Sequence, residues 1–221
     1  MLGHFPPPHD EELLYSVCAR YHYRVKSRSV DVPTTLRELF GTNDRVHTQF
    51  PRHLEHLVVQ LPQEFSITAG RLIDKNTLAP MMQPFLTSQD FARLRADMSG
   101  ADRSSRRRMV RYPLGEHNKL KYCPFCAQED RVAVGEAYWH RVHQSSIVQV
   151  CVKHECHLSF AKLDPTSRCL LLAEDVVRTG GPVQIVDTRN HHEAVLVWMA
   201  DKAQWLLQLQ PGPPARRKDN I

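Results

Sequence analysis

Four residues in the middle of the 221-residue chain have the identities and the spacing of a metal site. Cys123 and Cys126 form a Cys-x2-Cys pair, and Cys151 and His154 form a Cys-x2-His pair after 24 intervening residues. Each short spacing turns the chain so that two donors converge on one ion, and two such pairs complete a tetrahedral shell. A mixed set of thiolates and an imidazole without redox context favours Zn2+ over iron. We expect one structural zinc ion, because four protein ligands leave no coordination position for water.

The fourth ligand has rivals close by in the sequence. His154 is favoured because its spacing from Cys151 mirrors the spacing of Cys123 and Cys126. The rival donors are His140, His143, Cys156 and His157.

The sequence does not carry the motifs of the common catalytic sites. A catalytic zinc would need three protein ligands, a bound water and a nearby general base, and Glu136 lies in no His-x-Glu or His-Glu-x-x-His motif. The nucleophile elbow Gly-x-Ser-x-Gly and the phosphate-binding loop Gly-x4-Gly-Lys-Ser/Thr are also missing. We therefore predict a binding protein and not an enzyme.

The composition is that of a folded protein in a reducing compartment. Hydrophobic residues make up 42% of the chain and charged residues 24%, as in ordinary globular proteins. The longest apolar run is well short of the roughly 18 residues that a membrane span needs, and the N-terminus does not resemble a secretory signal. Two of the six cysteines form the Cys-x2-Cys pair, so metal-bound thiolates in a cytoplasm are favoured over disulfides.

One segment carries the whole positive excess of the chain. Residues 103–122 hold seven basic residues and one acid, a net charge of +6, whereas the whole chain carries +5. Neutralisation of phosphates by Arg and Lys is a local effect, so this segment predicts a contact with nucleic acid. The alternative is a solvated basic loop without a partner. The candidate contacts are Arg103, Arg106, Arg107, Arg108, Arg111, Lys119 and Lys121.

The periodicity predicts a mostly α fold with a small β zinc ribbon. Short amphipathic helices are expected after Asp10, between Pro33 and Gly41, and after Pro51, with more helix over residues 66–100, where Thr87 is an N-cap. Strands are expected around the ligand pairs, with a helix near residues 136–142. The predicted domains are a helix-turn-helix-like helical domain (1–100), a basic segment with the zinc ribbon (101–165), and a C-terminal helical segment with a tail (166–221).

A last helix is predicted from about Asn190 to Gln208. Apolar residues line one side of this helix, joined by Trp198 and Trp205, which are seven residues apart. Such a stripe indicates either core packing or a surface for a partner helix. The other members of the stripe are Leu196, Met199, Ala203 and Leu206.

Several short strings resemble the TniQ/TnsD family, the target-selection proteins of bacterial transposons. The resemblance covers roughly residues 4–163. It rests on Phe5-Pro6-x-Pro8, Asp10-Glu11-Glu12-Leu13-Leu14-Tyr15-Ser16, Ala19-Arg20, Tyr122-Cys123-Pro124-x-Cys126, Gly135-Glu136-Ala137-x-Trp139-x-Arg141 and Cys151-x-Lys153-His154.

This resemblance implies a non-catalytic role in DNA transposition. Proteins of this family carry an N-terminal helix-turn-helix and a zinc ribbon, mark an integration site, and recruit the AAA+ ATPase regulator of the transposon. Long members bind an attachment sequence through further C-terminal domains, and short members couple to a CRISPR effector with its guide RNA or to the ATPase filament. Because the chain ends soon after the predicted ribbon, we expect an adaptor in the bacterial cytoplasm, associated with the nucleoid.

The expected partners are therefore the ATPase regulator and either DNA or a CRISPR effector–guide RNA complex, with a homodimer as one further assembly and no membrane contact. The alternative function is a transcription regulator with a zinc ribbon and a helix-turn-helix, which would read an operator as a dimer.

Overall fold

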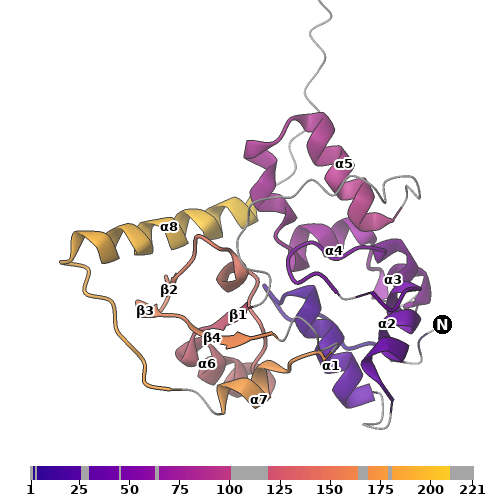
Figure 1. The fold of residues 1–221 in the computed structure, drawn as a ribbon, viewed down its shortest axis with the longest axis horizontal. Coiled ribbons are helices and arrows are strands. Elements are labelled where there is room, and N and C mark those ends of the chain that lie inside the picture. Colours follow the sequence, from indigo (N-terminus) through magenta and orange to yellow (C-terminus); the bar gives the residue numbers. More distant parts are fainter. Residues whose placement is uncertain are drawn as a thin grey trace, which may run out of the picture.

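The computed structural model describes residues 2, 4–25, 30–44, 46–62, 65–100, 119–163, 169–178 and 181–209. These residues form a mostly helical fold with two small antiparallel sheets (Figure 1). Among them, no helix combines the length and the apolar character that crossing a membrane requires. The predicted nucleic-acid contacts Arg103, Arg106, Arg107, Arg108 and Arg111 lie outside the described residues.

The N-terminal half, residues 4–100, is helical, as the sequence predicts. Its described elements are α1 (Leu14–Val25), α2 (Val32–Phe40), α3 (Leu54–Gln60), α4 (Ala69–Asn76), the 3-10 helix η2 (Ala79–Phe85) and α5 (Ser88–Ser99).

Local side-chain and glycine signals set the ends of these helices. The side chain of Asp31 caps α2 by accepting a hydrogen bond from the Thr34 amide, and Thr87 caps α5 through the Asp90 amide. Gly41 ends α2 at φ 70°, in the left-handed region that glycine adopts without steric cost. The predicted cap at Thr87 and the predicted end at Gly41 are therefore confirmed.

The predicted start of the first helix is wrong. Helix α1 begins at Leu14 and not after Asp10. Glu11 has φ 54°, which breaks a helical path, and Glu12 forms an isolated antiparallel bridge with His140. The two acids thus contact a distant part of the chain, which overrides their preference for a helix N-terminus.

The predicted helix-turn-helix needs two helices joined by a turn of 3–4 residues. Residues 41–53 separate α2 from α3, and residues 61–68 separate α3 from α4. Helix α2 packs against α3, and α3 packs against α4 and α5. The helix-turn-helix therefore remains a prediction, while the helical character of this half is observed.

The C-terminal half, residues 119–209, combines short strands with helices. Strand β1 pairs antiparallel with β4, with Tyr122 opposite Ser159, and β2 pairs antiparallel with β3, with Cys151 opposite Cys156. Its described elements are β1 (Lys119–Tyr122), α6 (Pro124–Val134), η4 (Val142–Gln144), β2 (Val150–Cys151), β3 (Cys156–His157), β4 (Ser159–Lys162), α7 (Ala173–Val177) and α8 (His191–Gln208).

The helix predicted between the ligand pairs is misplaced. It runs over Pro124–Val134 and not near residues 136–142. Proline is favoured in the first turn of a helix, and Gly135 at φ 84° ends this helix. The chain beyond Gly135 is therefore free to run along the N-terminal half in an extended form.

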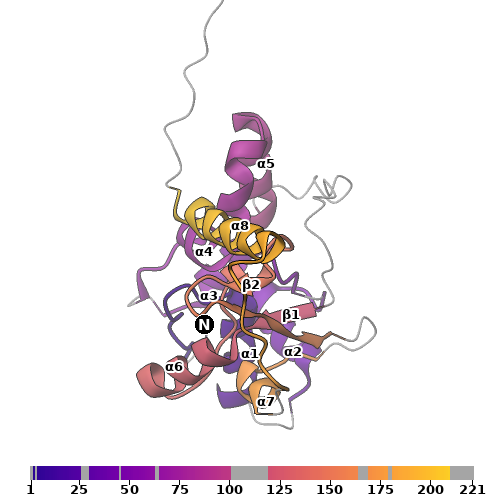
Figure 2. The ribbon, with the colours of Figure 1, turned by 90° about the vertical axis from the view of Figure 1, so that its left-hand side faces the viewer.

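The two halves share one hydrophobic core. A single cluster of buried apolar side chains extends from Leu2 to Leu207 and includes the fully buried Trp139. Helix α8 contacts η2 of the N-terminal half as well as η4 and β2 of the C-terminal half (Figures 1 and 2). The division at residues 100 and 165 remains a prediction, and the segments on either side of it pack on one another.

Helix α8 has two apolar faces, and only one of them is covered by the described residues. Leu196, Ala200, Ala203 and Leu207 are buried against the rest of the protein. Trp198 and Trp205 are 61% and 56% exposed. Core packing, one of the two alternatives for the apolar stripe of this helix, is therefore wrong for Trp198 and Trp205.

Candidate metal centre

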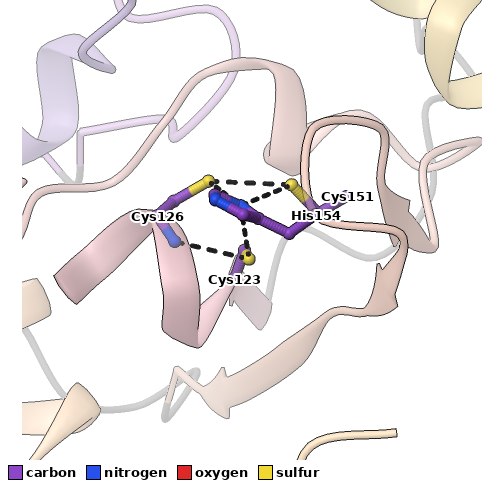
Figure 3. A group of neighbouring side chains, drawn as sticks. All are labelled: Cys123, Cys126, Cys151 and His154. Atoms are coloured by element: carbon purple, nitrogen blue, oxygen red, sulfur yellow. Dashed lines mark hydrogen bonds between the residues drawn. The ribbon is translucent and has the colours of Figure 1, made fainter. Parts of the chain in front are cut away.

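The four residues predicted as ligands lie together. The ligand atoms of Cys123, Cys126, Cys151 and His154 are all within 4.8 Å of one another (Figure 3). His154 Nδ1 is 3.4, 3.3 and 3.6 Å from the sulfurs of Cys123, Cys126 and Cys151. A tetrahedral zinc ion with Zn–S bonds of about 2.3 Å keeps neighbouring donors about 3.5–3.8 Å apart. These residues could hold a metal ion, and both their spacing and their donor chemistry fit zinc.

The first pair of ligands sits at the N-terminus of α6. Cys123 is the N-cap of this helix, and its sulfur accepts a hydrogen bond from the Cys126 amide at 3.5 Å. The positive end of the helix dipole favours a thiolate at this position. Cys123 and Cys126 are therefore positioned by the N-terminus of a helix. The predicted zinc ribbon would instead have positioned them on a turn between β-strands.

The thiols depend on one another for their ionisation. Hydrogen bonds from the Cys126 and Cys151 thiols lower the pKa of Cys123 to about 3, while the hydrogen bond with Cys123 raises the pKa of Cys126. Ionising one sulfur thus makes it harder to ionise its neighbour. A bound divalent cation compensates the repulsion between thiolates and deprotonates coordinating thiols.

The second pair of ligands sits on the β2–β3 hairpin. Cys151 ends β2, and His154 lies in the connecting loop. Glu155 has φ 44°, and its carbonyl accepts a hydrogen bond from the Val186 amide at 2.8 Å. Contacts from the segment before α8 therefore hold this loop in a conformation that is unfavourable for a residue other than glycine.

A carboxylate orients the imidazole. His154 Nε2 is 3.2 Å from a carboxylate oxygen of Glu129, and the other oxygen of Glu129 accepts a hydrogen bond from Lys153 Nζ at 2.6 Å. The hydrogen bond from Lys153 is the main cause that lowers the pKa of Glu129. A carboxylate on the second ring nitrogen is the usual support of a histidine ligand, so Nδ1 is the candidate donor atom to the metal.

One rival ligand, Cys156, lies against the site. Its sulfur is fully buried and 3.4 Å from the sulfur of Cys123, and burial raises its pKa to about 12. From its spacing in the sequence, Cys156 is one of several alternative fourth ligands. The register of the hairpin sets Cys156 opposite Cys151 and so places a fourth sulfur beside the cluster.

The other rivals contact acids or one another, and His143 also makes a hydrogen bond with the candidate ligand Cys151. His140 Nε2 is 2.9 Å from a carboxylate oxygen of Asp130, and His157 Nε2 is 3.7 Å from Glu193. His143 is buried, and its ring centroid is 5.2 Å from that of His140. Among the described residues, the four predicted ligands are the group whose donor atoms lie close enough together for one metal ion.

The chain between the two ligand pairs is joined to the start of α1 by backbone hydrogen bonds. The Leu13 amide donates to the Trp139 carbonyl, and the Arg141 amide donates to the Glu11 carbonyl, each at 2.9 Å. The Trp139 amide donates to the hydroxyl of Ser16 at 3.1 Å. We call this contact of residues 11–20 with residues 136–141 the seam. Most of the strings that resemble the TniQ/TnsD family outside the ligand pairs lie in it.

Buried charges complete the seam. Arg20 donates to the carboxylates of Glu12 and Glu136, each at 2.8 Å, and Arg141 makes a two-pronged contact with Glu11 at 2.6 and 2.8 Å. Arg20 and Arg141 are 4% and 1% exposed. Removing one partner of a buried ion pair costs about 3–5 kcal/mol, so the seam fixes how residues 136–141 sit on the N-terminal half.

Glu136, whose sequence context did not support a general base, belongs to this seam. Its carboxylate is paired with Arg20 and, at 2.5 Å, with Arg24. Two guanidinium groups occupy the hydrogen-bond acceptors of this carboxylate. The structure therefore gives Glu136 a role in joining the two halves.

The two described lysines of the basic segment, Lys119 and Lys121, differ in their surroundings. The ammonium group of Lys121 donates to the carbonyls of Ser145 and Val148, and burial lowers its pKa to about 8. Lys119 Nζ is 5.1 Å from the centroid of the Phe160 ring. We leave Lys121 out of the proposed nucleic-acid contact, because its ammonium is turned into the protein.

The described residues define a mostly helical protein with a Cys3His cluster that could hold a metal ion. The model of the TniQ family matches residues 4–158, and the chain belongs to this family. This match confirms the resemblance drawn from the ligand pairs and the seam strings.

A relative with a curated description is the transposon Tn7 transposition protein TnsD of Escherichia coli. It is 28% identical to this chain over 157 residues, which are 69% of this chain and 30% of the relative. The chain thus spans less than a third of the length of that relative. TniQ and TnsD proteins select targets in transposition.

We predict that the purified protein contains one zinc ion per chain. X-ray absorption at the zinc edge should show three sulfurs at about 2.3 Å and one nitrogen at about 2.0–2.1 Å. Cys126→Ser should lose the metal and destabilise residues 119–163, because the free energy of metal binding contributes to folding. Cys156→Ala is the matched control, since it removes a buried sulfur beside the cluster and should keep both the zinc and the nitrogen ligand. A spectrum with four sulfurs that falls to three in Cys156→Ala would contradict this ligand set.

Proposed function

We propose that this protein is a non-catalytic, zinc-stabilised adaptor in DNA transposition. It links a target site, as DNA or as an RNA-guided complex, to the AAA+ ATPase regulator of the transposon. The observation that carries the proposal is the TniQ match over residues 4–158. That segment contains both ligand pairs and both sides of the seam, so it folds around one centre.

The geometry supports a platform more than a reaction centre. The four candidate ligands come from the chain itself, and together they would fill a tetrahedral shell around one ion. Glu136, the acid considered as a general base for a catalytic zinc, is paired with two arginines. Such a framework can supply a rigid surface that holds two binding partners in a fixed relative position.

The proposed DNA contact lies in the basic segment between the two halves. Helix α5 ends at Ser99, and β1 begins at Lys119, so the described residues on either side of 101–118 belong to the folded protein. The proposed contacts are Arg103, Arg106, Arg107, Arg108, Arg111 and Lys119. Contacts of this kind neutralise phosphates and position a protein on DNA without reading the base sequence.

Reconstitution with the ATPase regulator and the transposase of the same element tests the adaptor role. With zinc present, the protein should retain the ATPase in a pull-down with ATP and should concentrate insertions beside the target site. Cys126→Ser should lose both effects, whereas Cys156→Ala should keep them.

Two results would overturn the adaptor role. One is ATPase retention and an insertion profile that are the same with and without the protein. The other is unaided protection of a palindromic operator without any effect on insertion, which is the behaviour of a transcription regulator.

We predict a salt-dependent, sequence-tolerant component of DNA affinity. Replacing Arg106, Arg107 and Arg108 by Ala should lower the slope of log affinity against log salt by about 0.9 for each phosphate that is no longer neutralised. A matched control replaces Arg93, Arg178 and Arg189, three exposed arginines that are each paired with an acid, and should leave the slope nearly unchanged. An equal slope in the first variant and the native protein would refute the phosphate contact.

A further inference from the structure

The metal centre holds one thiol more than a closed zinc shell uses. Three cysteines and one histidine form the candidate ligand set, while the sulfur of Cys156 lies 3.4 Å from that of Cys123 without belonging to the set. Cys156 is fully buried, and Leu158 and Val183 pack against the four clustered cysteines. A thiol in contact with ligand thiolates can form a disulfide with one of them, so Cys156 adds redox chemistry to this centre.

Cys123 and Cys126 form the first of two pairs whose backbone positions suit a disulfide. They span the first turn of α6, with Cys123 at the N-cap, and Cα atoms at this helical spacing are about 5 Å apart. Disulfides join residues whose Cα atoms are about 4.4–6.8 Å apart. A Cys-x-x-Cys pair at the N-terminus of a helix is also the arrangement of the thiol–disulfide oxidoreductases, in which it closes and opens reversibly.

Cys151 and Cys156 form the second pair. They lie directly opposite each other in the β2–β3 hairpin, where Cα atoms of antiparallel strands are about 4.5–5.5 Å apart, again within the range of a disulfide. Bonds from Cys123 to Cys156 or from Cys126 to Cys151 would instead join α6 to the hairpin. The two local pairs are favoured over these, because a short loop closes at a lower cost in chain entropy.

We propose that peroxide oxidises this centre to two disulfides, Cys123–Cys126 and Cys151–Cys156. Cys156, which is not a candidate ligand, is the resolving thiol of Cys151. In each pair a ligand thiolate attacks one peroxide oxygen, breaks the O–O bond and expels hydroxide, which leaves a sulfenic acid. The neighbouring sulfur then displaces the hydroxyl group and forms the disulfide. In total, three thiolates, one thiol and two molecules of hydrogen peroxide give two disulfides, three hydroxide ions and one water.

Oxidation removes the ligands of the metal ion. The thiolate is the form of cysteine that binds a metal, so the Cys123–Cys126 bond takes away two of the four ligands and the Cys151–Cys156 bond takes away a third. Only His154 of the candidate set is left, and the ion leaves. A metal ion links α6 to the hairpin, whereas each disulfide closes within one of these elements. The residues between the two ligand pairs therefore lose the link that joins their ends.

A hollow in the surface gives a small oxidant a route to the sulfurs. His154 lines a hollow of about 450 Å3 together with Phe125 and Val132 of α6. The Nδ1 atom of the same imidazole is 3.3–3.6 Å from the three ligand sulfurs (Figure 3). On this side of the centre the imidazole separates the hollow from the sulfurs, so displacement of one side chain opens them to peroxide.

Peptide mapping of the zinc-loaded, full-length protein tests the pairing. After treatment with hydrogen peroxide and alkylation of the remaining thiols, trypsin should release residues 122–131 as one peptide with an internal disulfide. Cleavage after Lys153 separates the other two cysteines, so residues 142–153 should be recovered joined to residues 154–162.

A zinc-binding dye follows the ion in the same reaction. One zinc ion per chain should be released while four of the six cysteines lose their thiols. Dithiothreitol and added zinc should restore both the thiols and the bound metal. The measurements use a Cys169→Ser background, because Cys169 is exposed and could link separate chains.

Cys156→Ala tests the resolving role apart from metal binding. The reduced variant should bind zinc and should still release it under peroxide, through the Cys123–Cys126 bond. Without its partner, Cys151 should advance to the sulfinic acid, which dithiothreitol does not reverse. Zinc rebinding after reduction should therefore fall severalfold relative to the parent protein. The matched control Cys18→Ala removes a buried thiol of α1 and should rebind zinc as the parent does.

Any of three results contradicts the proposal. The first is zinc retention, with all four thiols reduced, in a peroxide excess that oxidises free cysteine in the same solution. The second is disulfides that join α6 to the hairpin in place of the two local ones. The third is equal rebinding of zinc by Cys156→Ala and its parent after reduction. The adaptor role does not depend on these outcomes, since it is read from ATPase retention and insertion.

Discussion

The organisation of this protein depends on the seam between residues 11–20 and residues 136–141. The chain leaves the first pair of candidate ligands along α6, turns at Gly135, crosses the N-terminal half, and returns to the second pair on the β2–β3 hairpin. A metal ion held by both ligand pairs would fix both ends of the chain segment between Cys126 and Cys151. The backbone bonds of Leu13 and Arg141 would then be made by a chain segment that already has little conformational freedom, which lowers the entropy cost of forming the seam.

Buried charges make this junction specific. Arg20 makes both of its carboxylate contacts when Glu12 of the N-terminal half and Glu136 of the C-terminal half are in place together. A buried ion pair contributes little net stability compared with apolar packing, but a broken one is strongly unfavourable. The seam therefore penalises other relative positions of the two halves.

The sequence predicts local features well because their causes are local. The ligand spacing, the cap at Thr87 and the last helix, which begins after Asn190 as predicted, depend on residues that are neighbours in the chain. The features that sequence reasoning missed depend on distant partners. Glu11 and Glu12 resemble helix-starting acids, yet Glu11 pairs with the distant Arg141 and Glu12 forms a β-bridge with the distant His140. The place of Cys156 beside the ligands follows from hairpin register, and the exposure of Trp198 follows from which face of α8 the core uses. Periodicity alone determines neither.

The most direct test of this account is hydrogen exchange at the seam with and without metal. The amides of Leu13 and Arg141, which donate across the seam, should exchange slowly in the zinc-loaded protein and much faster after chelation, while the Phe91 amide in the first turn of α5 serves as an internal reference that changes little. Equal protection of Leu13 and Arg141 after complete removal of the metal would show that the seam forms without it. That result would contradict the claim that the metal centre organises the fold.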